Sequence, residues 1–208
     1  MDADAVEIRV LGSLIEKQRT TPDAYPLSLN ALRLACNQST NRDPVADYDE
    51  RTIREALNRL SRRGWTRLAS GPGSRAAKFR HLFDEALALS DEETAILCVL
   101  MLRGAQTPGE LKQRAQRLHS FSGLAELESV LDDLIGRDLV ARLPRRPGQK
   151  EERYEHLLSR AAPTGVAEAA APETALASDR VAELELAVRE LREEVDELRR
   201  ELESLRAS

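Results

Sequence analysis

Residues 49–83 read DERTIREALNRLSRRGWTRLASGPGSRAAKFRHLF, and this stretch decides the fold. The apolar residues of its first part recur every three or four positions, which predicts a helix with one buried face: they are Ile53, Ala56, Leu57 and Leu60. Asp49 is placed to cap this helix and Gly64 to end it. Residues 65–69 and 76–83 then predict two strands, joined by a tight turn at residues 71–74.

Two further helices are expected before this stretch. Residues 5–18 carry apolar side chains at helical spacing and are stopped by Thr20-Thr21-Pro22. Ser28 can cap a second helix that extends to about Cys36, with its leucines, Leu29, Leu32 and Leu34, expected to face inward. Three helices followed by a β-hairpin is the order of a winged-helix domain.

The same order recurs in the second half of the chain. Helices are expected after Ser90, from Thr107-Pro108 and over residues 124–136, followed by strands at 139–143 and 152–158. Leu57-Asn58-Arg59-Leu60 corresponds to Leu131-Asp132-Asp133-Leu134, so a duplicated unit is the simplest explanation. The expected fold class is therefore α+β, mainly α with small β-hairpins. It comprises tandem winged-helix domains at residues 1–84 and 85–158.

The rest of the chain differs in character. Residues 159–177 are rich in Ala, Pro, Thr and Glu and predict a flexible linker. Residues 178–208 predict a coiled-coil helix that forms a parallel homodimer, because valine predominates at a and leucine fills d. Its interface residues are Val181, Leu184, Val188, Leu191, Val195, Leu198, Leu202 and Leu205. The alternative is an amphipathic helix that docks on the body of its own chain.

Composition and charge restrict the class of protein. The hydrophobic fraction is 41% but aromatic residues make up only 3%, so the cores must be aliphatic, which suits small helical domains. Ten acids and six arginines lie in residues 178–208, so most of the net charge of −5 belongs to the tail. The sequence shows no apolar run long enough to span a membrane and no secretory signal. Cys36 and Cys98 suggest no disulfide framework. We therefore expect a cytoplasmic protein with no membrane partner.

Cations concentrate on the predicted third helix and hairpin of the first domain. Residues 51–80 contain nine positive charges and one acid, Glu55. Arginine pairs well with phosphate and with guanine edges, so duplex DNA is the expected partner of this surface. The expected contact residues are Arg51, Arg54, Asn58, Arg62, Arg63, Arg75 and Lys78. The alternative is an ordinary solvated or protein-binding face.

The second domain lacks this pattern. Its third helix carries four acids, Glu126, Glu128, Asp132 and Asp133, which would repel phosphate. The hairpin over residues 142–150 is basic and could contact only the DNA backbone. We expect this helix to serve domain packing or a protein partner.

Signatures of enzymes, cofactors and metals are not apparent. The glycines of residues 71–74 belong to a hairpin turn rather than to a phosphate-binding loop. His81 and His156 occupy equivalent strand ends and are expected to be structural, and the cysteines lack metal-ligand spacing. We expect neither catalytic residues, nor a cofactor, nor a bound metal.

Several strings resemble the YceH family of bacterial proteins. They are LGSLIEK at 11–17, TTPDAYPLSLNAL at 20–32, ACNQ at 35–38 and RGAQTPGEL at 103–111. The resemblance covers about residues 5–158 and implies tandem winged helices, but it implies no established activity and no catalytic residues. Within it, residues 21–27 are either a functional signature or, as we favour, a rigid turn in which Tyr25 caps the core.

Two functions remain at this point. The first is a DNA-binding protein, such as a transcriptional regulator, in which the coiled coil pairs two first domains on a duplex. The second is a non-enzymatic dimeric protein-interaction scaffold, for which the polar loop at residues 37–44 is a candidate contact. They differ in whether the arginines of residues 51–80 form one outward patch or are neutralised by acids of the second domain.

Overall fold

The structure is a computed structural model, and it describes residues 2–69, 76–145 and 151–159. All of them belong to one compact unit, residues 1–165. Over these residues the chain combines seven α-helices with two small antiparallel sheets, so the predicted α+β class is confirmed. The predicted coiled-coil residues 178–208 and nearly all of the predicted linker lie outside the described residues.

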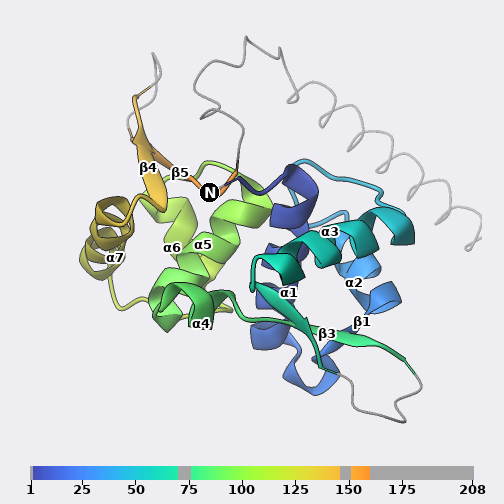
Figure 1. Ribbon diagram of the computed structural model, residues 1–208. Helices are drawn as coiled ribbons and strands as arrows, with labels where there is room; N and C mark the ends of the chain where they lie inside the picture. The colour runs from blue at the N-terminus through green and yellow to red at the C-terminus, as the bar shows by residue number, and fades with distance from the viewer. Residues whose placement is uncertain (1, 70–75, 146–150, 160–208) are drawn as a thin grey trace, which may run out of the picture. The chain divides into compact units, whose positions relative to one another are not determined.

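The first half contains three helices and a three-stranded sheet (Figure 1). The sheet has the order β1-β3-β2, with Phe79 of β3 paired to Leu27 on one side and Leu68 on the other. The elements are α1 (Ala5–Thr20), the 3₁₀-helix η1 (Pro22–Ala24), β1 (Leu27–Ser28), α2 (Leu29–Cys36), α3 (Glu50–Arg62), β2 (Thr66–Leu68) and β3 (Lys78–His81).

The second half repeats the order of three helices and a hairpin after one short helix. Its strands pair antiparallel, with Val140 opposite His156 and Leu143 opposite Arg153. The elements are α4 (Phe83–Leu87), α5 (Asp91–Arg103), α6 (Pro108–Ala115), α7 (Leu124–Gly136), β4 (Val140–Leu143) and β5 (Arg153–His156).

The helix starts follow from local capping chemistry. The side chains of Ser28, Asp49, Ser90 and Thr107 each accept a hydrogen bond from the backbone N–H three residues later, as expected for N-caps. One predicted orientation is wrong: Leu34 in α2 is 56% exposed rather than turned inward. The buried face of α2 consists instead of Leu32, Ala35 and Cys36, which are three and four residues apart.

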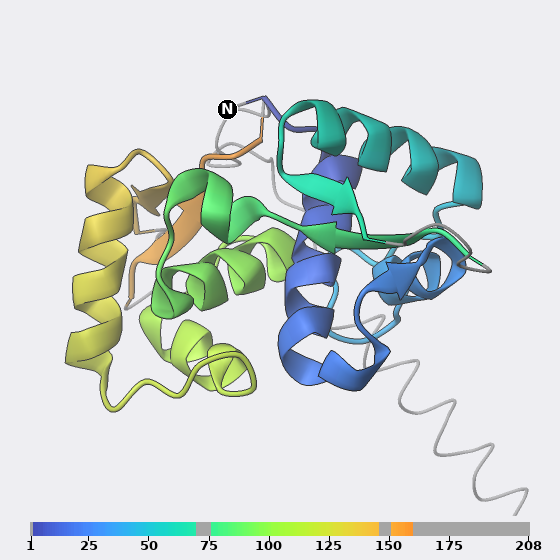
Figure 2. The same cartoon turned by 60° about the horizontal axis from the view of Figure 1, so that its bottom comes forward.

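Helix α1 lies at the centre of the unit. Its residues from Glu7 to Ile15 are all buried, including the charged Glu7 and Arg9. Figure 2 shows the reason: α1 lies between α2 and α3 on one side and α5 on the other. The approach to α5 is close, because a Cβ atom added at Gly12 would lie 3.0 Å from the side chain of Leu102.

A continuous apolar core joins the two halves. It includes Leu14 of α1, Leu60 of α3 and Leu97 of α5, each with no accessible surface. Trp65, just before β2, contacts Phe83 of α4 edge to face at a centroid distance of 5.2 Å. Among the described residues, no helix has the length and apolarity needed to cross a membrane.

Candidate nucleic-acid interface

Helix α3 is positioned by its cap and by its apolar face. The Asp49 carboxylate accepts a hydrogen bond of 2.7 Å from the backbone N–H of Thr52, and this bond lowers the pKa of Asp49 below its usual value. The four apolar residues predicted to face the core are all buried. The opposite face carries exposed polar side chains, and they are Arg51, Arg54, Asn58 and Arg62.

Several cations of this surface have no acidic partner. Among the described residues, no carboxylate lies within ion-pair distance of Arg54, Arg62, Arg67 or Lys78, and all four are exposed. Arg51 differs, because its Nε lies 3.0 Å from the Glu55 carboxylate one turn further along the helix. That pair is exposed to solvent, so it holds Arg51 only weakly.

Two other arginines of the cationic stretch face the N-terminal segment. Arg59 pairs with Asp4 at 2.7 Å, and Arg63 lies 3.4 Å from the carboxylate of Glu7 and donates to the carbonyl of Asp2 at 2.6 Å. Glu7 is buried, so these contacts fasten α3 to the start of α1. Arg63 was a predicted DNA contact, and in this arrangement its guanidinium is already engaged.

The hairpin carries further positive charge on β2, which packs against α3, and on β3. Lys78 is exposed at the start of β3, opposite Ser28 of β1. Arg67, counted in the basic stretch but not singled out from the sequence, is exposed on β2 and is paired in register with Arg80. Arg80 forms an ion pair with Glu85 of α4. Arg75, the other predicted hairpin contact, lies outside the described residues.

The corresponding surface of the second half is acidic or internally neutralised. Glu128, Asp132 and Asp133 are exposed on α7. Arg142 of β4 lies 3.2 Å from Asp132 and 3.6 Å from Glu152, so its charge is balanced within its own half. Among the described residues, none of these acids pairs with an arginine of residues 51–80. The ion pair between Arg80 and Glu85 of α4 is the one contact of that stretch with an acid of the second half among them, and it leaves the cations of α3 unpaired with that half.

Residues 21–27 have a structural role. The hydroxyl of Tyr25 accepts a 2.8 Å hydrogen bond from the backbone N–H of His81, the last residue of β3. Burial raises the pKa of Tyr25 to about 12 and lowers the pKa of His81 to about 4. Both groups are therefore neutral near pH 7, and this hydrogen bond ties the segment between η1 and β1 to the end of β3.

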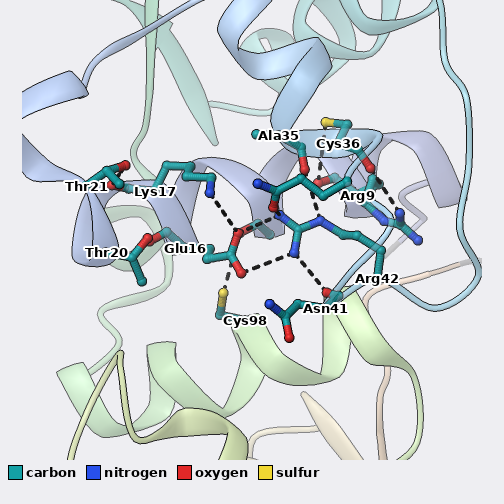
Figure 3. A network of polar contacts seen from close by, with 12 residues as sticks. Arg9, Glu16, Lys17, Thr20, Thr21, Ala35, Cys36, Asn41, Arg42 and Cys98 are labelled. Carbon is teal, nitrogen blue, oxygen red and sulfur yellow. Dashed lines mark hydrogen bonds and ion pairs between the residues drawn. The ribbon is translucent and has the colours of Figure 1, made fainter. Parts of the chain in front are cut away.

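One polar network was not foreseen from the sequence (Figure 3). The guanidinium of Arg42 donates to both carboxylate oxygens of Glu16 at 3.1 and 2.5 Å and to the carbonyl of Ala35 at 3.0 Å. Arg9 donates to the carbonyls of Cys36 at 3.1 Å and Pro44 at 2.6 Å. Both arginines are buried, and they hold the loop that connects α2 to α3.

Comparison with known proteins identifies relatives along most of the chain. Residues 3–149 match the family described as "Protein of unknown function, DUF480". A UPF0502 protein of Citrifermentans bemidjiense is 56% identical over 158 residues, 75% of this chain and 73% of the relative. A UPF0502 protein of Klebsiella pneumoniae strain 342 is 51% identical over 160 residues, 74% of each chain. A UPF0502 protein of Serratia proteamaculans is 44% identical over 191 residues, 88% of this chain and 89% of the relative.

Proposed function

The chain belongs to the DUF480 family of unknown function, and we propose that it binds duplex DNA through α3 and the β2–β3 hairpin. We place it among non-enzymatic cytoplasmic proteins that act on DNA, such as transcriptional regulators. The relatives' names carry no function, so the proposal rests on the surface of α3.

The observation that carries the proposal is the exposed, unpaired cations of α3. Arg54, Asn58 and Arg62 follow one another at intervals of four residues, so they lie along one face of the helix. At about 1.5 Å per residue the two arginines are about 12 Å apart along the axis, similar to the width of a major groove. The arginines can contact phosphates or guanine edges, and an asparagine between them can pair with adenine.

The order of helices and strands along the chain supports the same mode of binding. We interpret the two runs of three helices and a hairpin as tandem winged-helix domains at residues 1–84 and 85–158. In related helix-turn-helix proteins the recognition helix enters the major groove, and α3 occupies the corresponding place in the chain. Lys78 would then contact the backbone beside the groove.

The C-terminal segment would join two chains, so that the dimer could contact two half-sites of one duplex. We propose that residues 178–208 form a parallel two-stranded coiled coil, on the strength of their a and d pattern. A homodimer would present two copies of α3 to one duplex, and paired contacts would raise the affinity above that of a single domain.

A second function has support from the other half of the molecule. Glu128 and Asp133 are exposed on α7, and their charge opposes binding to phosphate. This face suits a protein partner better than a nucleic acid. A dimeric scaffold that uses the second half for protein contacts is therefore the alternative, and it does not require the cations of α3.

The proposal is tested by removing the two unpaired arginines of α3. We expect the double variant Arg54→Gln, Arg62→Gln to bind a random-sequence duplex at least about tenfold more weakly, because hydrogen bonds to charged groups contribute about 1.5–3 kcal/mol each. Fluorescence anisotropy of a labelled duplex measures this change. Unfolding free energy should stay within about 0.5 kcal/mol for each exposed substitution.

The control is Lys112→Gln, which removes one charge from α6, away from α3. Its duplex affinity should match that of the wild type within about twofold, and Arg54→Gln alone provides the comparison at equal charge. Equal affinities for wild type and the double variant would reject the α3 surface as the binding site and favour the scaffold.

A further inference from the structure

A cavity of about 840 Å³ lies between α1, the loop after α2, α5 and α6. It is separate from the cationic face of α3, because none of its lining residues belongs to α3 or to the hairpin. Its wall is mainly polar, with amide and hydroxyl groups such as those of Gln38, Thr40 and Gln113 beside charged side chains. Its volume is in the range that accommodates a metabolite.

Positive charge predominates in the lining. The cations are Lys17, Arg103, Arg114 and Arg117, and the one acid among the described lining residues is Glu16. Figure 3 shows Glu16 in contact with Arg42, which takes both of its carboxylate oxygens. Lys17 lies at 3.8 Å from the same carboxylate, so this one acid is shared between Arg42 and the cations of the lining.

Arg103 and Arg114 are two lining cations close enough to repel each other. Burial lowers the pKa of Arg103, the nearby Arg114 and Arg42 lower it further, and Glu16 and Asp43 offset part of that shift. The side chain of Arg103 donates to the amide oxygen of Asn41, which is neutral. Arg114 lies 3.6 Å from Glu110, and Glu110 is shared with Arg153 at 3.4 Å. An anion bound between Arg103 and Arg114 would remove the repulsion between them.

We propose that this cavity binds a small, multiply charged oxyanion, a phosphorylated or polycarboxylate metabolite. Guanidinium groups recognise both classes of oxyanion through paired hydrogen bonds. The described residues of the lining include no aromatic side chain on which a nucleobase could stack, and its amides and hydroxyls suit a hydroxylated ligand. The site does not depend on DNA binding, since it shares no residue with the α3 surface.

Isothermal titration calorimetry of the full chain tests the proposal with two probes, sodium pyrophosphate and sodium citrate, at matched ionic strength. We expect saturable binding of at least one probe with one site per chain. Arg103→Gln should weaken that binding about tenfold, because it removes a charged hydrogen-bond donor. Binding by pyrophosphate alone identifies a phosphate ligand, and binding by citrate alone identifies a carboxylate ligand.

Two further variants keep the result interpretable. Gln113→Glu changes an exposed side chain of the lining, so it should leave the fold intact and still weaken binding by adding a negative charge. Arg54→Gln removes a cation of α3 and should leave probe affinity unchanged even where duplex binding falls. The proposal is overturned if neither probe binds, or if Arg103→Gln and Gln113→Glu bind as tightly as the wild type.

Discussion

Arg42 has no accessible side-chain surface, and Glu16 is only 15% exposed. Removing one partner of such a buried ion pair lowers the stability of the fold, because the remaining buried ion has lost its hydration without gaining a counter-charge. The bidentate contact therefore fixes the loop between α2 and α3 more firmly than an exposed pair could. Arg51 and Glu55 provide the comparison within the same chain, since their side chains are 86% and 54% exposed.

Glu16→Gln should destabilise the fold by about 3 kcal/mol, because it leaves the buried guanidinium of Arg42 without a counter-charge. Glu55→Gln removes an acid of the same type from the exposed pair and should cost less than about 1 kcal/mol. Urea denaturation followed by circular dichroism measures both free energies of unfolding. Equal values for the two variants would show that the buried pair does not hold the loop.

Charge pairing was the property that sequence reasoning predicted least well. The stretch at residues 51–80 was correctly identified as basic, but its count of cations does not show which of them are engaged. Arg59 and Arg63 are neutralised by Asp4 and Glu7, more than fifty residues away along the chain, and no local pattern reveals such partners. The burial of Arg9 and Arg42 has no local signal either, since it depends on tertiary packing.

The helices were predicted well because their signals are local. Caps and apolar spacing fixed the starts of α2, α3, α5 and α6 at Ser28, Asp49, Ser90 and Thr107. Strand β1 was missed because its two residues are ordered by pairing with β3 and have no periodicity of their own. Residues 76–83 were expected to form one strand, but β3 ends at His81 and the short α4 begins at Phe83.

The contact between α1 and α5 gives a prediction about Gly12. Gly12→Ala should destabilise the protein by about 1–2 kcal/mol, because the new methyl group would press on the buried Leu102 and overpacking costs more than the gain in helix propensity. Thermal unfolding measures the change as a lower Tm.

Gly136→Ala is the matched control. Gly136 ends α7, and a Cβ atom added there would have no other atom within 4 Å, so alanine should be neutral or stabilising by up to about 1 kcal/mol. A Gly12→Ala variant that is as stable as Gly136→Ala would mean that α1 and α5 can move apart without a loss of stability.

On the scale of the whole molecule, the two halves share one core. Helix α1 of the first half packs on α5 of the second, and Phe83 links them through Trp65. The acidic face of α7 and the basic face of α3 nevertheless remain unpaired with each other among the described residues. The proposed assignment of DNA to one half and a protein partner to the other follows from this separation of charge.

Deleting residues 178–208 should leave a folded chain that self-associates less. The described residues 2–159 already contain a buried apolar core of their own, whereas eight apolar residues at a and d of the tail need a partner helix. Sedimentation equilibrium of full-length and truncated protein measures the masses. The same number of chains per particle for both proteins would show that the coiled coil is not the dimer contact.

The central claim, that the unpaired cations of the first half bind DNA backbone, is tested most directly by the salt dependence of duplex binding. Each neutralised phosphate contributes about −0.9 to the slope of log affinity against log salt. With Arg54, Arg62, Arg67 and Lys78 engaged, we predict a slope of about −3 to −4 per bound chain, reduced by about 2 in the double variant Arg54→Gln, Arg62→Gln. An affinity that does not change with salt, or an equal slope for wild type and variant, would contradict the claim.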